Sequence, residues 1–389
     1  MTLASCPVCG GTDTEEVFTL RAVPVVLNQL WPDAAAARDA PVGDVELVMC
    51  AGCALIWNRA FDPGRMVYAP GYENALHFSP RFQAFAEELA AGLVARNGLE
   101  GRHVVEIGCG DGYMLDLMVK HGAATATGFD PSMDGRETSY TAREGVRIVP
   151  EYFSADQLGR PLDFIMCRHT LEHLDAPARL LGDIRRAIGG REVPVYFEVP
   201  NAGWMLEAVS MWDVIYEHVT YWTAPSLAAL FRRTGFSPDV REGYGSQFLM
   251  VEARPGPVEP GQRPADADMV GAAARAFAGA AKAELSRWSD RLSSLDGRAV
   301  IWGAGSKGIG FANALGPTGK ALAALVDLNP RKHGLSAPGV ALPVVAPDEL
   351  RAIRPDLVLI SNALYAEEII AEVRRMGLEP RFDSIAREA

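Results

Sequence analysis

The sequence predicts an α/β protein made of three parts: a small metal-binding domain, a doubly wound parallel sheet, and a second, smaller sheet of the same kind. A buried strand runs into a glycine turn at two places, residues 103–112 and 299–308, and such units open doubly wound sheets. Two pairs of cysteines precede the first unit. Four prolines within residues 254–264 lie between the two units and predict a spacer.

Composition and charge exclude several classes of protein. A chain of 389 residues holds two to three domains of roughly 150 residues each. Hydrophobic residues make up 49% and charged residues 22%, which excludes a largely disordered chain. The 37 Lys and Arg against 49 Asp and Glu leave a net charge of -12, which excludes a general nucleic-acid binder because phosphate attracts basic surfaces. Since the chain has no apolar run of roughly 18 residues and no apolar leader, we expect a soluble cytoplasmic protein with no membrane partner.

Four cysteines form the clearest motif near the start of the chain. They fall in two CxxC pairs, Cys6 with Cys9 and Cys50 with Cys53. A CxxC turn places two thiolates on one side of a tight loop, and two such turns supply four soft ligands at the tetrahedral geometry that zinc prefers. Because four cysteines close the coordination shell, we expect a structural zinc in a domain that spans residues 1–66. Two disulfides or four unrelated thiols are the alternatives.

Two acidic residues, one before the first glycine turn and one at the end of the next strand, indicate which ligand the turn binds. Glu106 lies two residues before the glycines of the turn, which runs through Gly108, Cys109 and Gly110. Asp130 ends the next strand, 24 residues after Glu106. An acid at that position can accept the ribose hydroxyls of an adenosine. The turn alone suits NAD, FAD or S-adenosylmethionine, but it lacks the GxGxxG spacing of a dinucleotide site.

The flanking elements complete a doubly wound sheet within residues 67–255. We expect helices over 80–98 and 113–120 and strands over 103–107, 125–129, 147–150, 162–167, 193–200 and 247–253. Ligands collect at the carboxyl ends of such strands, so His169 and His173, which follow the fourth strand, should lie near the ligand. Support of the loop is their alternative role. Cys109 and Cys167 are interpreted as packing residues or as lining of the cofactor pocket.

An insert over residues 201–245 places a carboxylate beside an imidazole among aromatic residues. Glu217 and His218 lie between Trp212 and Trp222, with Tyr221 close by. Apolar surroundings disfavour charge, and a neutral histidine is a competent base near neutral pH. We expect His218 to act as the base and Glu217 to orient its ring or to bind substrate hydroxyls. A buried histidine with satisfied hydrogen bonds is the alternative.

The last third of the chain, residues 256–389, predicts a second sheet of Rossmann type. An alanine-rich helix over 268–295 leads into the second strand and glycine turn, and a further strand ends in Asp327. The turn from Gly303 to Gly308 contains Lys307, which suits an anionic group. We interpret this turn as a cradle for a pyrophosphate or carboxylate, or as a turn that only packs this domain against the active site.

Several of these motifs resemble those of known methyltransferases. The acid-x-Gly-x-Gly-x-Gly pattern at Glu106 and the downstream Asp130 resemble motifs I and II of class I S-adenosylmethionine methyltransferases over residues 78–255. The whole chain is similar to the sugar C-methyltransferases of deoxysugar pathways. Gly303 to Gly308 resembles that family's Gly-Ala-x-x-Lys-Gly, and Asp327 to Gly334 resembles its Asp-x-Asn-x-x-Lys-x-Gly.

The resemblance implies a fold, a reaction and a set of site residues. It implies a class I methyltransferase sheet between a zinc domain and a Rossmann-like C-terminal domain, and carbon methylation beside the carbonyl of a nucleoside-diphosphate keto-deoxysugar, as in antibiotic biosynthesis. The implied cofactor-binding residues are Glu106, Gly108, Cys109, Gly110, Asp130 and His169. The implied catalytic residues are His218, Glu217, His173, Tyr72 and Tyr216. Oxygen or nitrogen methylation with the same histidine as base, and a non-catalytic ligand-binding or assembly role, are the alternatives.

Overall fold

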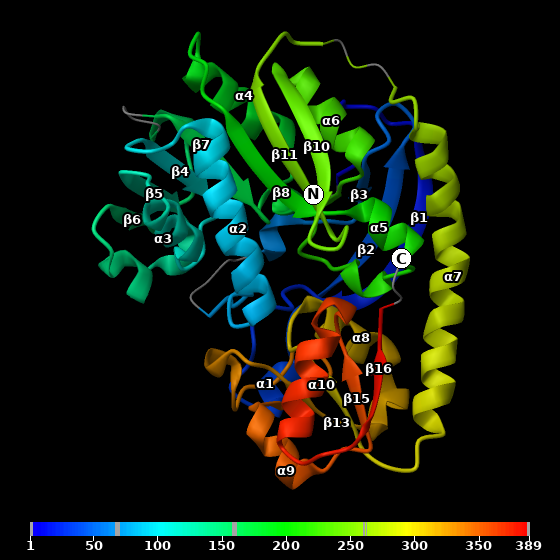
Figure 1. Ribbon diagram of the computed structural model, residues 1–389. Helices are drawn as coiled ribbons and strands as arrows, with labels where there is room; N and C mark the ends of the chain where they lie inside the picture. Colours follow the sequence, from blue (N-terminus) through cyan, green and yellow to red (C-terminus); the bar gives the residue numbers. More distant parts are fainter. Residues whose placement is uncertain (1–2, 67–70, 158–161, 260, 262, 387–389) are drawn as a thin grey trace.

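Three sheets make up the protein, as the computed structural model in Figure 1 shows. The structure describes residues 3–66, 71–157, 162–259, 261 and 263–386. The expected boundary at residue 66 therefore adjoins residues outside this description, and so do residues 260 and 262 of the expected spacer. None of the described helices combines the length and the apolar surface that a membrane crossing requires.

The N-terminal sheet has four antiparallel strands in the order β1-β2-β3-β9. Its strands are β1 (Thr14–Pro24), β2 (Val42–Cys50), β3 (Ile56–Asn58) and β9 (Thr220–Tyr221), with helix α1 (Ala34–Arg38) between the first two. The fourth strand comes from the insert, since Ile56 pairs with Tyr221 and Trp57 with Thr220. The insert thus completes a sheet that begins more than 150 residues earlier in the chain, which places its aromatic residues against the N-terminal sheet.

The central sheet has seven strands in the order β10-β11-β8-β7-β4-β5-β6. They are β4 (His103–Ile107), β5 (Thr125–Phe129), β6 (Val146–Val149), β7 (Phe164–Arg168), β8 (Val195–Pro200), β10 (Phe236–Gly243) and β11 (Phe248–Pro255). The helices of this region are α2 (Pro80–Asn97), α3 (Tyr113–Lys120), α4 (Pro177–Ile188), α5 (Ala202–Glu207) and α6 (Ala224–Arg233). Strands β4 to β8 pair in parallel and β11 pairs antiparallel to β8 and β10. The six strands read from the sequence are present within two residues of their expected starts, and β10 was not expected.

The C-terminal sheet has five parallel strands in the order β14-β13-β12-β15-β16. Its elements are α7 (Ala267–Ser293), β12 (Ala299–Trp302), α8 (Ser306–Leu315), β13 (Leu322–Val326), β14 (Val344–Val345), α9 (Leu350–Ile353), β15 (Leu357–Ile360), α10 (Ala366–Arg375) and β16 (Arg381–Ser384). Figure 1 shows α7 running along one side of the molecule, from β1 down to this sheet. Helix α7 therefore connects the N-terminal sheet with the C-terminal sheet.

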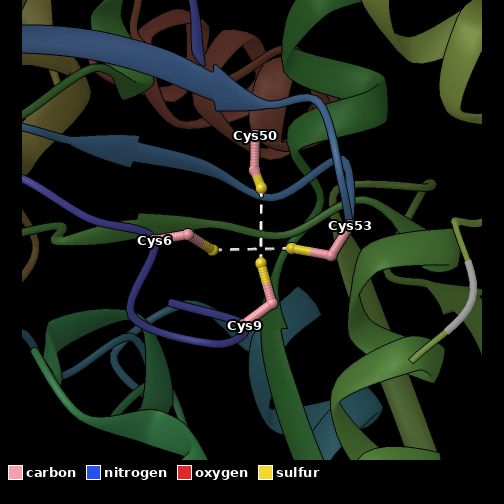
Figure 2. A group of neighbouring side chains, drawn as sticks. All are labelled: Cys6, Cys9, Cys50 and Cys53. Carbon is pink, nitrogen blue, oxygen red and sulfur yellow. Dashed lines mark hydrogen bonds between the residues drawn. The ribbon is translucent and has the colours of Figure 1, made fainter. Parts of the chain in front are cut away.

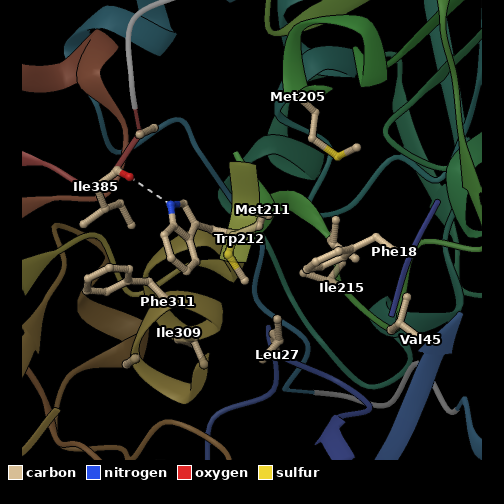
Figure 3. Close-up of a cluster of buried hydrophobic side chains, with 14 of the residues drawn as sticks. Phe18, Leu27, Val45, Met205, Met211, Trp212, Ile215, Ile309, Phe311 and Ile385 are labelled. Atoms are coloured by element: carbon tan, nitrogen blue, oxygen red, sulfur yellow. Dashed lines mark hydrogen bonds between the residues drawn. The ribbon is translucent and has the colours of Figure 1, made fainter. Parts of the chain in front are cut away.

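One hydrophobic core joins the N-terminal sheet, the insert and the C-terminal sheet (Figure 3). The indole nitrogen Nε1 of Trp212 donates a hydrogen bond to the carbonyl oxygen of Ile385 at 2.9 Å. The ring of Trp212 lies 4.8 Å from that of Phe311 in α8, and the ring of Phe18 in β1 lies 5.3 Å from that of Phe277 in α7. The insert is thus held in place by the two outer sheets as well as by its own strand connections.

Candidate active site and metal site

The four cysteines of the two CxxC pairs lie together (Figure 2). The Sγ atoms of Cys6 and Cys53 are 3.5 Å apart, those of Cys9 and Cys50 are 3.4 Å apart, and all four lie within 4.8 Å of one another. A tetrahedral shell with Zn–S bonds of about 2.3 Å places sulfur atoms about 3.8 Å apart. The two dashed lines in Figure 2 cross, as opposite edges of a tetrahedron do. The four thiols therefore fit a zinc ion with no open coordination position.

The carboxyl ends of β4, β5 and β7 open into a cavity of about 280 Å³, here named the glycine-turn cavity. Gly108 and Gly110 in its wall have φ angles of 71° and 52°. A Cβ on Gly108 would lie 1.9 Å from Oγ1 of Thr170, so only glycine fits there. Glu106 is 2% exposed and its Oε2 has no hydrogen-bond partner among the described residues. Burial raises the pKa of Glu106 to about 8, and the unpaired Oε2 leaves this carboxyl able to form a hydrogen bond with a ligand.

Asp130 already accepts three hydrogen bonds within this cavity. Its Oδ2 accepts from the backbone nitrogen of Gly110 at 2.8 Å, and its Oδ1 accepts from the nitrogen and hydroxyl of Ser132 at 2.9 and 2.6 Å. A carboxylate has about four lone-pair positions. The arrangement thus leaves Asp130 room for one further donor, which is fewer than the two ribose hydroxyls expected from the sequence. Cys109, also in the wall, is buried and packs against Gly128.

His169 lies between two cavities in a strained conformation with φ of 48°. Its Nε2 is 2.9 Å from Oε1 of Glu198 and its Nδ1 is 3.7 Å from Oε1 of Glu172. Burial lowers the pKa of His169, but the two carboxylates outweigh this effect and raise the pKa to about 9. His169 is therefore a cation near neutral pH and not a base.

The second cavity, of about 300 Å³, is named here the histidine cavity after His173 and His218 in its wall. The rings of these two histidines are 5.0 Å apart, and the ring of His218 is 5.9 Å from that of Tyr221. Burial, with a smaller effect of the nearby His173, lowers the pKa of His218 to about 3. Burial also lowers the pKa of His173. Both imidazoles are thus neutral near pH 7 and able to accept a proton.

One hydrogen bond determines which nitrogen of His173 carries the proton. Nδ1 of His173 lies 2.9 Å from the carbonyl oxygen of Glu217, which can only accept. Nδ1 must therefore be the donor, and Nε2 of the neutral ring is an acceptor. This tautomer suits His173 as a second base or as a positioning group, whereas its Nε2 cannot donate a hydrogen bond to a substrate oxygen.

Glu217 and Tyr216 do not reach the histidine cavity. The buried carboxylate of Glu217 accepts hydrogen bonds from the backbone nitrogens of Leu27 and Asn28 at 3.0 and 3.4 Å, and burial raises its pKa to about 8. The hydroxyl of Tyr216 accepts from the backbone nitrogen of Asp62 at 2.9 Å, because its ring points toward the N-terminal sheet. The expected contacts of these two side chains with substrate are therefore corrected: both join the insert to the N-terminal part of the chain. Tyr72, in contrast, lines both cavities.

The second glycine turn forms the far wall of the histidine cavity. The backbone of Gly305 to Gly308, at the N-terminus of α8, lines it. Lys307 pairs with Asp213 of the insert at 2.6 Å and lies 4.8 Å from the ring centre of Trp204. Lys332 contacts Asp327 at 3.3 Å and is 5% exposed. Both lysines are paired with carboxylates, so the unshared donors of this wall are the backbone N–H groups at the start of α8, where a helix attracts anions.

Two buried acids, Glu198 beside His169 and Glu172 beside His173 and His218, were missed in the sequence. The carboxylate of Glu198 in β8 pairs with Arg168 at 2.9 Å and is fully buried. Glu172 is 1% exposed, and one oxygen lies within 4.8 Å of ring nitrogens of His173 and His218. An acid within the apolar run of β8 was the one available signal for Glu198, because strand interiors seldom hold an unpaired charge.

Two family models match the chain. A methyltransferase domain matches residues 82–239, which contain the first glycine turn, His173 and His218. A C-methyltransferase C-terminal domain matches residues 274–379.

The chain carries a methyltransferase domain.

The seven-stranded sheet is thus the class I methyltransferase sheet that the sequence predicted, followed by a second, smaller Rossmann-like sheet.

Curated relatives match parts of the chain. A ubiquinone biosynthesis O-methyltransferase of Coxiella burnetii is 31% identical over 88 residues, and the alignment covers 21% of this chain and 37% of the relative. The chain thus spans well under half of that relative's length. A protein of the same description from Caulobacter sp. is 26% identical over 201 residues, which covers 49% of this chain and 76% of the relative.

Solved structures of methyltransferases align with less than half of the chain. The plantazolicin methyltransferase BpumL covers 46% of this chain and 88% of its own at a TM-score of 0.37 and 15% identity. The 1,6-didemethyltoxoflavin-N1-methyltransferase of Burkholderia thailandensis covers 44% of this chain and 78% of its own at a TM-score of 0.34 and 21% identity.

Proposed function

We propose that this protein transfers the methyl group of S-adenosylmethionine to a carbon atom beside the carbonyl of a nucleoside-diphosphate keto-deoxysugar. The observation that carries the proposal is the position of neutral, buried His218 in a cavity that adjoins the glycine-turn cavity and is closed by the second glycine turn. The match of the last third of the chain to a C-methyltransferase C-terminal domain supports a carbon acceptor.

The residues of the glycine-turn cavity fit the cofactor. The unpaired carboxyl of Glu106, the glycine backbone at Gly108 and Gly110, and the remaining lone pair of Asp130 supply acceptors and close approach. Bound S-adenosylmethionine supplies an electrophilic methyl group. His169, a cation in the shared wall, holds the loop between the cavities through Glu172 and Glu198.

The histidine cavity provides the base. His218 removes the proton from the carbon beside the carbonyl, the C–H electron pair becomes part of an enolate, and the proton stays on the imidazole. Burial makes His218 a weak base in the free protein, so the carbonyl must be polarised by a donor before the proton moves. Tyr72 lines both cavities and is the proposed donor. The protein contributes mainly position and enolate stabilisation.

The wall opposite the histidines supports the proposed substrate class. The N-terminus of α8 offers donors to a diphosphate, and Lys307 and Lys332 stand beside it, each shared with an aspartate. The aromatic side chains of Trp204 and Tyr221 and the two histidines face a sugar-sized volume nearer the cofactor. The four cysteines would bind a zinc ion that stabilises the N-terminal part and takes no part in the methyl transfer.

Solvent exchange separates carbon methylation from its rivals. The purified protein is incubated in deuterium oxide with nucleotide-linked keto-sugars and without S-adenosylmethionine. Carbon methylation predicts deuterium beside the carbonyl, detected by mass spectrometry, and loss of that exchange in His218→Asn. Product formation without exchange would instead support oxygen methylation, which the ubiquinone O-methyltransferase relatives favour as the second candidate. The same screen, repeated with S-adenosylmethionine, identifies the sugar.

A further inference from the structure

Two adjacent residues of the C-terminal part of the chain face two different cavities. Arg331 and Lys332 lie in one 3₁₀ turn, Pro330–Lys332, which is capped by the side chain of Asn329. Arg331 lines the glycine-turn cavity, whereas Lys332 lines the histidine cavity. The family model of the C-terminal domain begins at residue 274, so Arg331 is a residue of that domain in the wall of the proposed cofactor site.

Arg331 makes two short ion pairs in that wall. Its Nη1 is 2.9 Å from Oε2 of Glu73, and its Nη2 is 2.9 Å from Oδ2 of Asp111. The side chains of these two acids are only 10% and 11% exposed. The guanidinium also lies 5.3 Å from the ring centre of Phe78. A guanidinium that contacts two carboxylates in a partly buried site holds both side chains in place through charge-assisted hydrogen bonds.

The two carboxylates belong to the parts of the chain that form the cavity. Asp111 is the fourth residue of the turn that starts at Gly108. Glu73 lies in the segment 72–76, and Tyr72, Asn74, Ala75 and Leu76 of this segment line both cavities. Glu73 is also paired with Arg136 at 3.3 Å, and its backbone nitrogen donates to the carbonyl oxygen of Asn28 at 2.9 Å. Arg331 therefore bridges the glycine turn and the wall between the cavities.

We infer that Arg331 is a positioning residue for the cofactor: the C-terminal domain completes the S-adenosylmethionine site by holding the glycine turn through Asp111 and the dividing segment through Glu73. The inference rests on the proposed function only in that the glycine-turn cavity holds this cofactor. It does not depend on which substrate is methylated. The C-terminal domain thus has a second task beside closing the histidine cavity.

Binding of S-adenosylhomocysteine, measured by calorimetry on the full zinc-loaded chain, tests the inference without any substrate. Arg331→Met should raise the dissociation constant about tenfold, which equals about 1.4 kcal/mol. Arg331→Lys keeps the charge but cannot contact both carboxylates at once, so its dissociation constant should lie between those of the parent chain and Arg331→Met. Arg374→Met is the matched control, because Arg374 lies in the same domain with a side chain 61% exposed and lines neither cavity.

A double-mutant cycle and a second analogue separate positioning from a charge effect and from misfolding. If Arg331 acts through Asp111, then Arg331→Met combined with Asp111→Asn should lose less affinity than the product of the single losses. The cationic analogue sinefungin should lose affinity as S-adenosylhomocysteine does. Unchanged binding of S-adenosylhomocysteine to folded Arg331→Met would overturn the inference, and so would tighter binding of sinefungin alone, which would show a charge effect. Failure of the parent chain to bind either analogue would instead refute the proposed function.

Discussion

Replacing Glu217 by glutamine should change how stability depends on pH. The carboxyl group is fully buried, and burial raises its pKa from 4.5 to about 8. A raised pKa in the folded chain means that the folded state holds a proton that the unfolded state releases between pH 4.5 and 8. The stability that Glu217 contributes is therefore complete below pH 4.5 and is lost as the pH rises toward 8.

The size of the loss follows from the shift. One pKa unit corresponds to about 1.4 kcal/mol, so Glu217 costs the folded chain about 3 kcal/mol at pH 7 and about 4 kcal/mol at pH 8, relative to pH 4.5. Glutamine stays neutral and its oxygen can accept the backbone N–H groups of Leu27 and Asn28. Its amide nitrogen faces Nδ2 of Asn28, another donor, where Glu217 Oε2 lies 3.5 Å away. We thus expect Glu217→Gln to be less stable by about 1 kcal/mol at pH 5 and more stable than the parent at pH 8.

Urea unfolding of zinc-saturated protein, followed by tryptophan fluorescence from pH 5 to 8.5, measures this difference. Other buried groups, such as Glu106 and His218, titrate in both chains and cancel in the comparison. Glu16→Gln, at a side chain 84% exposed, is the matched control and should differ from the parent by a constant amount. A parent-to-variant difference that stays constant across the range would show that Glu217 is ionised in the folded protein, and the reasoning would be refuted.

Three further variants test the proposed site. His218→Asn should lower the rate of methyl transfer by about 10²–10⁴-fold with unchanged calorimetric affinity for S-adenosylhomocysteine. Because the pKa of His218 is about 3, its titration should cause no rise in the parent rate between pH 5 and 7. A variant that reacts at the parent rate would make His173 the base. Cys50→Ser should release about one zinc ion per chain in metal analysis and lower the unfolding midpoint, whereas a zinc-free chain of unchanged stability would contradict a structural metal. Asp130→Ala removes an acceptor worth about 1.5–3 kcal/mol and should weaken S-adenosylhomocysteine at least about tenfold, and unchanged affinity would mean that Asp130 only supports the turn.

Local motifs in the sequence led to the parts of the site that depend on short stretches of chain. The strand and glycine turn at Glu106 need only their own residues to form, since Gly108 and Gly110 permit the turn. The two cysteine pairs are likewise local loops, and only their meeting depends on the strands between them. These features could be read without a structure because each one's chemistry and geometry lie within a few residues.

Side-chain directions in the insert could not be read in this way. Glu217 turns toward Leu27 and Asn28, which are 189 or more residues away in the sequence, and Tyr216 turns toward Asp62. Strand β10 escaped notice because it is an edge strand with a proline and with mostly exposed or half-buried side chains, so its apolar pattern is weak. In each case the position depends on a packing partner that is distant in the sequence, so the neighbouring residues alone do not predict it.

The core that surrounds Trp212 limits which segments of this chain can be exchanged with those of another protein. Trp212 lies three to six residues before the residues of the histidine cavity, Ile215 and His218, and it contacts Phe311 and the carbonyl of Ile385 in the C-terminal sheet. A hybrid that took residues 256–389 from another chain would place a foreign surface against Trp212 and displace the segment that carries His218. A folded hybrid would therefore require residues 202–221 from the same donor, because the two segments share one core.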